Sequence, residues 1–153
     1  MTPEDGLLKT GSVDPTREKF KAFMTRPQDT PIHMLNLIRL RPLALYPEGH
    51  ENHGKAMSGL EAYRAYGATT AAIFARVGGR QVWAGRPEVV LTGPDDEHWD
   101  IAFIAAYPNA LAFAEMVRDP DYKEYVKHRQ AAVLDSRLIR FFPFAPGAGF
   151  GEA

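Results

Sequence analysis

The sequence of 153 residues contains no cysteine, which excludes disulfide bonds, thiolate nucleophiles and cysteine-ligated zinc or iron–sulfur centres. It also has little net charge, because 18 lysines and arginines are balanced by 19 aspartates and glutamates. This balance gives no electrostatic ground for binding nucleic acid or an anionic membrane. No apolar run approaches the roughly 20 residues that span a bilayer. The start, MTPEDGLLKT, lacks the apolar stretch of a secretory signal, so we expect a cytoplasmic protein with no membrane partner.

Several common functional motifs are missing as well. There is no P-loop and no G-x-S-x-G elbow, and the GAGFG stretch near the C-terminus has the wrong spacing for a dinucleotide fingerprint. The stretch HENHG at 50–54 differs from the HExxH metal helix, because its histidines are three residues apart and it lies in a turn-rich segment. We therefore expect His50 and His53 at the surface, and we expect neither a metal nor a cofactor.

Hydrophobic spacing and capping residues give the order of the elements. We expect the first helix to begin with Asp14 as its cap and Pro15 at its first position. The next begins with the capping-box stretch SGLE at 58–61 and ends at the glycine pair 78–79. The pattern predicts helices at 15–25, 58–77, 110–117 and 120–134, and strands at 31–40, 80–93, 99–107 and 136–144. The 80–93 segment is one bent strand or two short strands broken at Pro87.

The resulting core order, β-α-β-β-α-β, is the ferredoxin-like pattern of an α+β protein, here with an extra N-terminal helix. We expect a single domain over 1–153, made of an N-terminal extension (1–29), a ferredoxin-like core (30–144) and a flexible tail (145–153). The RNA-recognition motif shares this order, but the strand MLNLIRL lacks its stacking aromatic residues. RNA is therefore not an expected partner.

Three of the predicted strands, at 31–40, 99–107 and 136–144, are apolar at odd and even positions alike. That pattern indicates a sheet buried on both faces, and the two core helices can cover only one of them. We expect the sheet of a second copy to cover the other face, which gives a homodimer packed sheet to sheet. The alternative cover is the N-terminal helix, although one short helix covers little of a four-stranded sheet.

Five segments in collinear order carry a resemblance to a known family: MLNLIRL, SGLEAYRAYG, RVGGRQVWAG, HWDIAFIAAYP and DPDYKEYVKHRQAAVLDSRLI. Over about residues 30–140 the chain resembles the domain-of-unknown-function family numbered 1330, within the dimeric α/β-barrel group. The resemblance implies a ferredoxin-like protomer in a two-fold dimer, and it brings no established reaction. The wider group includes cofactor-free monooxygenases, isomerases, haem-binding proteins and small-molecule-binding modules, commonly with a pocket between sheet and helices. This fold-level analogy does not assign a function.

Two polar residues lie where apolar neighbours predict burial. Asn36 stands in the middle of MLNLIRL, where its amide either contacts a ligand or bonds within the protein. Arg129 lies among Tyr122, Tyr125, Val126 and Val133 on one side of its helix. A buried guanidinium needs an anion, supplied either by a ligand or by an internal carboxylate such as Asp135 or Asp100.

Other residues are weaker candidates. His98 is a candidate because a histidine side chain can act as an acid or a base, with Asp100 available as a partner elsewhere. We expect strand alternation to keep these two side chains from forming a dyad with each other. Tyr63, Trp99 and Tyr107 are the aromatic residues that we expect in the wall of a ligand pocket, with plain core packing as the alternative.

These observations lead to a small-molecule-binding dimer, and they leave open whether it is an enzyme. The first hypothesis is a cofactor-free oxygenase or isomerase acting on a small organic substrate, with Asn36, Arg129 and His98 as catalytic candidates. The expected ligand contacts are Asn36, Tyr63, Trp99, Tyr107 and Arg129. The alternatives are a non-catalytic, stress-type binding module and a structural dimer without a ligand.

Overall fold

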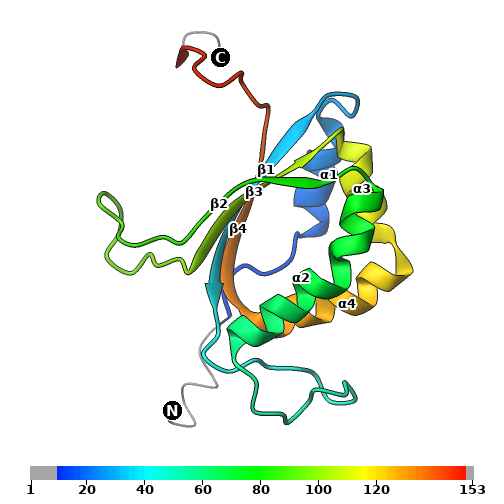
Figure 1. The fold of residues 1–153 in the computed structure, drawn as a ribbon, viewed down its shortest axis with the longest axis vertical. Helices are drawn as coiled ribbons and strands as arrows, with labels where there is room; N and C mark the ends of the chain where they lie inside the picture. Colours follow the sequence, from blue (N-terminus) through cyan, green and yellow to red (C-terminus); the bar gives the residue numbers. More distant parts are fainter. Residues whose placement is uncertain (1–9, 151–153) are drawn as a thin grey trace.

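A computed structural model describes residues 10–150 of the chain (Figure 1). Residues 1–9 of the expected N-terminal extension and 151–153 of the expected flexible tail lie outside the described part. The elements are α1 (Arg17–Thr25), β1 (Ile32–Leu40), α2 (Gly59–Arg76), β2 (Arg80–Gly85), β3 (Ile101–Tyr107), α3 (Ala110–Arg118), α4 (Pro120–Ala132) and β4 (Val133–Phe141). The strands form one sheet in the order β2-β3-β1-β4, and each neighbouring pair is antiparallel. This is the ferredoxin-like arrangement, and it confirms the predicted fold class.

Capping residues start the helices largely where the sequence predicts. The Ser58 side chain accepts a hydrogen bond from the Glu61 amide at 3.0 Å at the start of α2, and Asp119 caps α4 in the same way. The cap of α1 is Thr16, whose hydroxyl accepts from the Lys19 amide, so the prediction of Asp14 was wrong by two residues. The Asp14 carboxylate instead accepts a hydrogen bond from α4.

The predicted strand over 80–93 is too long. Only Arg80–Gly85 pairs with β3, and the chain then leaves the sheet at Pro87. Residues 86–98 project to the side of the sheet away from the helices (Figure 1). The tip of this segment carries the exposed apolar side chains of Val89 and Leu91. At the other end of the chain, β4 begins at 133 rather than 136, because it follows α4 directly.

One face of the sheet carries the core. Along β1 the buried positions alternate: Ile32, Met34, Asn36 and Ile38 point toward the helix layer. All four helices lie on this side of the sheet (Figure 1), and α1 packs Phe20 and Phe23 against the same core cluster. The alternative in which the N-terminal helix covers the second face is therefore wrong.

The opposite face is apolar and open. Strand register brings together on it Leu35 and Leu37 of β1, Ile104 of β3, Trp83 of β2, and Ile139 and Phe141 of β4. Trp83 keeps 52% of its surface exposed. No element within residues 10–150 packs over this face. A helix long and apolar enough to cross a membrane is also absent from this part of the chain.

Candidate functional site

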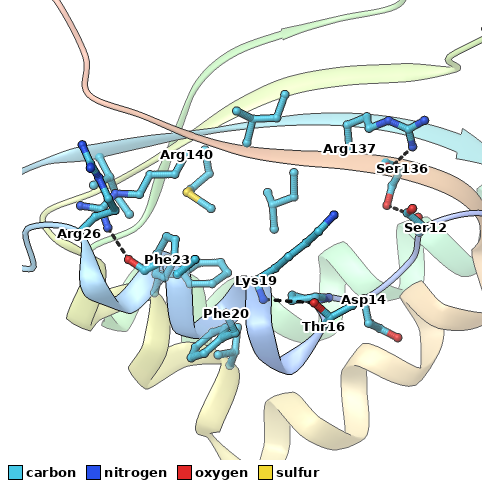
Figure 2. A pocket seen from close by; sticks show the side chains of 18 of the residues that line it. Ser12, Asp14, Thr16, Lys19, Phe20, Phe23, Arg26, Ser136, Arg137 and Arg140 are labelled. Atoms are coloured by element: carbon cyan, nitrogen blue, oxygen red, sulfur yellow. Dashed lines mark hydrogen bonds between the residues drawn. The ribbon is translucent and has the colours of Figure 1, made fainter.

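A large cavity lies between the sheet and the helix layer, beside the edge strand β4 (Figure 2). Its volume is about 1220 Å³, and its walls are the segment 10–16, α1, the start of β1, β4 and parts of α3 and α4. The apolar part of the lining consists mainly of Phe20, Phe23, Ile32, Met34, Phe113 and Val117. An apolar lining of this size suits an organic molecule.

Cationic side chains surround this apolar lining. Lys19, Arg26, Arg137 and Arg140 line the cavity (Figure 2). Arg129 lines it too, Asp14 is the acidic side chain of the lining, and Arg137 pairs with Asp135 at 2.9 Å. The cavity is therefore positively charged, and this charge favours an anionic ligand.

Arg140 and Arg26 form one end of the cavity. The Arg140 guanidinium donates to the carbonyl oxygens of Phe23, at 2.8 Å, and Pro27, and lies 5.0 Å from the centre of the Phe23 ring. Burial, and then repulsion by Arg26, lower the pKa of Arg140. Within the described residues, neither arginine has a carboxylate within 4.0 Å. Because these two neighbouring cations have no carboxylate partner, this end of the cavity favours binding of an anionic group.

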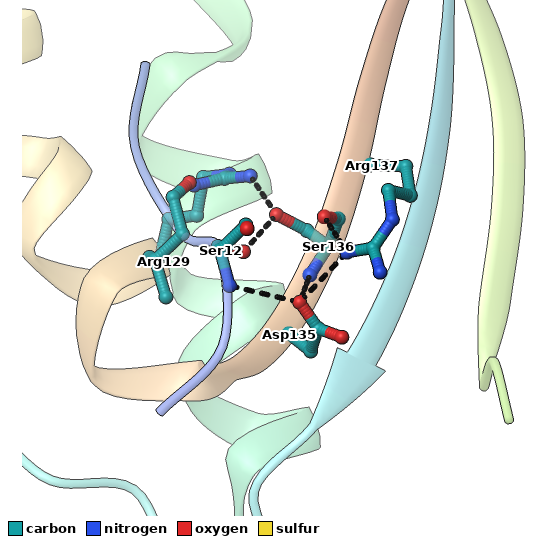
Figure 3. Close-up of polar contacts among 6 residues, drawn as sticks. Ser12, Arg129, Asp135, Ser136 and Arg137 are labelled. Atoms are coloured by element: carbon teal, nitrogen blue, oxygen red, sulfur yellow. Dashed lines mark hydrogen bonds and ion pairs between the residues drawn. The ribbon is translucent and has the colours of Figure 1, made fainter. Parts of the chain in front are cut away.

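Arg129 is buried, with 8% of its surface exposed, as its helical neighbours predict. Nη1 donates to the carbonyl oxygen of Val13 at 2.5 Å and lies 3.9 Å from a carboxylate oxygen of Asp14. Nη2 donates to the Ser136 hydroxyl at 3.3 Å (Figure 3). The guanidinium is thus tied to the N-terminal segment. Asp14 is a distant counter-ion, which leaves Arg129 able to contact a bound anion.

The two internal carboxylates expected to pair with Arg129 do not do so. Asp135 accepts from the Ser12 amide at 2.8 Å and from Arg137 at 2.9 Å (Figure 3). Asp100 accepts from the Leu40 amide at 2.8 Å. The reason at Asp135 is strand alternation, because Ser136 points toward Arg129 and its neighbour in β4 points to the other face.

Asn36 bonds to its own strand. Its Nδ2 donates to the carbonyl oxygen of Met34 at 3.1 Å, and the residue is 8% exposed on the helix-covered face. Its register partner on β4 is Leu138, which lines the cavity together with Met34. Asn36 therefore lies directly behind the cavity wall, and its contact with a ligand stays a prediction.

Tyr63, Trp99 and Tyr107 do not line this cavity. Tyr107 packs edge-on against two phenylalanine rings, and its hydroxyl contacts the sulfur of Met116 at 3.9 Å. Tyr63 packs in a second core cluster, where burial raises the pKa of its hydroxyl. Trp99 lies under the guanidinium of Arg137, 5.1 Å from the ring centre. Their expected role in a ligand wall stays a prediction.

His98 and Asp100 do form a pair, contrary to the expectation from strand alternation. His98 Nε2 lies 2.9 Å from a carboxylate oxygen of Asp100, in an exposed stretch before β3. The two residues are separated by one residue, so alternation places them on the same side of the chain rather than on opposite sides. The pair lies away from the large cavity, in a second cleft.

The turn-rich segment that contains HENHG packs against α4. The ring of Tyr46 stacks on His50 at 4.5 Å, and its hydroxyl bonds to His128 Nδ1 at 2.7 Å. His53 is exposed, whereas His50 and His128 are half-buried, so the surface position expected for His50 is only partly correct. Over residues 10–150, no three side chains gather that could hold a metal ion.

Sequence reasoning missed the N-terminal wall of the cavity. Ser12, Asp14, Lys19 and Arg26 belong to a segment that the family resemblance does not cover, and its position relative to β4 is not encoded in local spacing. One signal was available: Phe20 and Phe23 form an apolar stripe on a short helix, and such a stripe must pack against something.

The sheet order and the single helix layer define a ferredoxin-like α+β protein with a basic, apolar-lined cavity. The chain belongs to the family called Domain of unknown function (DUF1330), whose sequence profile matches residues 56–140. The family resemblance found in the sequence is thereby confirmed. No curated protein matches the chain.

Two similar solved structures are of RPA0582, a protein of unknown function from Rhodopseudomonas palustris. One, of the methylated protein, is 55% identical and covers 91% of this chain and 99% of that chain, with a TM-score of 0.83. The other is also 55% identical, covers 90% and 100%, and has a TM-score of 0.82. A more distant similarity is to SnoaB, a cofactor-independent oxygenase from Streptomyces nogalater, at 17% identity, 76% and 95% coverage and a TM-score of 0.47. That distance carries no functional argument.

Proposed function

We propose that this protein binds a small organic anion with an apolar body in the cavity between α1, β4 and the helix layer. The observation that carries the proposal is the combination of an apolar lining with Arg26 and Arg140, which have no carboxylate within 4.0 Å in the described chain. The apolar body of the ligand would lie against Phe23, Met34 and Phe113. Its anionic group would meet Arg26 and Arg140, where the two guanidinium groups already stand together.

Arg129 and Asn36 keep their predicted roles in this proposal. Arg129 is the anion contact at the opposite end of the cavity, where Asp14 is its distant counter-ion at 3.9 Å. Asn36 contacts only a ligand that reaches past Met34 and Leu138. An amide there would orient a carbonyl or hydroxyl group.

The functional unit in this proposal is a homodimer packed sheet to sheet. The supporting observation is the open apolar face, centred on Ile104 and Trp83, over which no helix or strand of residues 10–150 packs. Apolar faces of this kind in a folded domain mark interaction surfaces. A two-fold partner presents the same face, so the two faces are complementary in chemistry.

If the protein is an enzyme, the first proposal is a cofactor-free oxygenase or isomerase. Catalysis would then rely on acid–base chemistry and on electrostatic stabilisation by the positive charge of the cavity. The alternatives are a non-catalytic binding module and a structural dimer without a ligand. Turnover of the bound molecule distinguishes the enzyme from the non-catalytic binding module, since only the enzyme converts its ligand.

Native mass spectrometry of the purified full chain tests the proposal. We expect a dimer that carries a small mass, released as the activation energy is raised. Arg26→Gln should lower the occupied fraction strongly, because it removes an exposed cation from the anion-binding end. Arg17→Gln is the matched control, since Arg17 is also exposed, starts the same helix and lies outside the cavity.

Two results would count against the proposal. A chain that never carries a small mass, and that binds no aromatic or aliphatic carboxylate in a fluorescence or calorimetric titration, favours the structural dimer. Equal loss of occupancy in both arginine variants would show a general charge effect instead of a contact at Arg26.

A further inference from the structure

A second cleft, of about 840 Å³, lies at the end of the sheet where β1 and β2 stop and β3 and α2 begin. Arginines from different elements converge on it. Arg39 and Arg41 come from the end of β1, Arg64 from α2 and Arg86 from the residue after β2. The first turn of α2 also borders the cleft through Ser58 and Leu60, so the positive end of the helix dipole adds to the charge.

The four arginines have no carboxylate within 4.0 Å among residues 10–150. Arg41 is 7% exposed and donates to the hydroxyl of Thr10. Burial lowers the pKa of this guanidinium, which is the direction expected for a charge kept from water without a counter-ion. A bound anion would relieve that cost.

The acidic side chain in the cleft is already engaged. One carboxylate oxygen of Asp100 accepts from the Leu40 amide at 2.8 Å, and the other lies 2.9 Å from His98 Nε2. The carboxylate therefore accepts from Nε2–H, and in the imidazolium form Nδ1–H is left to donate to an anionic ligand. The arrangement is a histidine oriented by a fixed carboxylate, beside four cations.

We propose that this cleft binds a small anion of the phosphate or carboxylate class. The arginines hold its charge, and His98, oriented by Asp100, donates a further hydrogen bond to it from Nδ1–H as an imidazolium. Guanidinium groups suit both anions, because their planar donors match the spacing of the oxygens. This site is separate from the large cavity, and no residue of the proposed carboxylate end there takes part in it.

Isothermal titration calorimetry on the full chain at low salt tests the inference, with pyrophosphate and succinate as the probes. We expect saturable binding of at least one probe. The double variant Arg64→Gln/Arg86→Gln should bind it at least tenfold more weakly, because both side chains are exposed and removable without opening the core. The matched control is Arg17→Gln/Arg80→Gln, which removes the same charge from exposed positions outside the cleft and should bind within about twofold of the wild type.

The NMR signals of the His98 ring give a second readout. They should shift on titration in the wild type and in the control, and the cleft variant should need at least tenfold more probe for the same shift. Binding of pyrophosphate alone identifies a phosphate ligand, and binding of succinate alone identifies a carboxylate; either result supports the shared chemistry.

Two results would overturn the inference. The first is the absence of saturable binding in the wild type, and the second is equal weakening in both double variants. If the first result comes with a fall in the dimer mass of the cleft variant by sedimentation, the cleft receives carboxylates of the partner chain, for example from the acidic stretch 95–97.

Discussion

Replacing Trp83 by alanine should weaken the proposed dimer. The side chain lies on the open face opposite Ile104 and keeps 52% of its surface exposed. A tryptophan buries on the order of 200 Å², so a second sheet would cover roughly 100 Å² more of it. At about 25 cal/mol per Å² this amounts to about 2.5 kcal/mol per side chain. The two-fold symmetric dimer contains this contact twice, so the loss of association free energy is at most about 5 kcal/mol. The actual loss is smaller, because association also costs conformational freedom.

The dissociation constant of the dimer should therefore rise by between about 30-fold and a few thousand-fold, for a loss of about 2–5 kcal/mol. Sedimentation over a concentration series measures this change. Leu111→Ala is the control, because Leu111 is 50% exposed on α3, in the helix layer, and should leave the dimer unchanged. A wild type that is monomeric at all concentrations, or an equal effect of both substitutions, would refute the reasoning about the open face.

Three further predictions concern stability. Gly59→Ala should destabilise the fold by about 3 kcal/mol or more, because the new Cβ would lie 2.0 Å from the carbonyl oxygen of Arg41. Gly67→Ala, on the open surface of the same helix, should stabilise it by about 0.5–1 kcal/mol in urea unfolding. The hydrogen bond from Arg76, at 2.6 Å, holds the pKa of the Asp119 carboxyl below its usual value of 3.8. The ionised carboxylate therefore stabilises the fold fully at pH values above 3.8, and this contribution is lost as the pH falls through the lowered pKa. In the Arg76→Gln variant, the melting temperature should therefore fall less steeply between neutral and acidic pH than in the wild type. An unchanged pH dependence of the melting temperature would contradict the stabilising role of this ion pair.

Much of the fold can be predicted from local sequence. Caps such as Ser58 are short-range devices, since the hydroxyl and the amide it receives lie within one turn of helix. The strands of the sheet can also be predicted from local sequence. Strands with apolar residues at odd and even positions differ clearly from strands that have one solvent-exposed face. The stop of β2 at Gly85 is less predictable. It depends on the partner strand, since β3 pairs with β2 only from Ala102 onward.

The cavity depends on contacts between segments far apart in the chain. Its walls come from residues 10–27 and from β4, more than 100 residues later. Periodicity sorts the faces of one element, but it does not say which neighbour an apolar stripe such as Phe20 and Phe23 will meet. The same stripe fits a helix on either side of the sheet. Only its packing against Phe113 and Met34 decides that α1 closes the cavity and leaves the other face open.

Arg129 shows where local inference stops. Its burial follows from helical spacing, and so does its need for an acceptor. The choice among carboxylates does not, since Asp135 lies closer in sequence but alternation turns it to the other face of β4. One acceptor, the Val13 carbonyl, lies 116 positions earlier, and the other, the Ser136 hydroxyl, lies seven positions later in β4. The nearest carboxylate, on Asp14, remains 3.9 Å away. A guanidinium held mainly by the Val13 carbonyl and a hydroxyl keeps most of its charge unneutralised. That residual charge at the cavity wall is the physical reason to expect an anionic ligand there, whatever reaction follows.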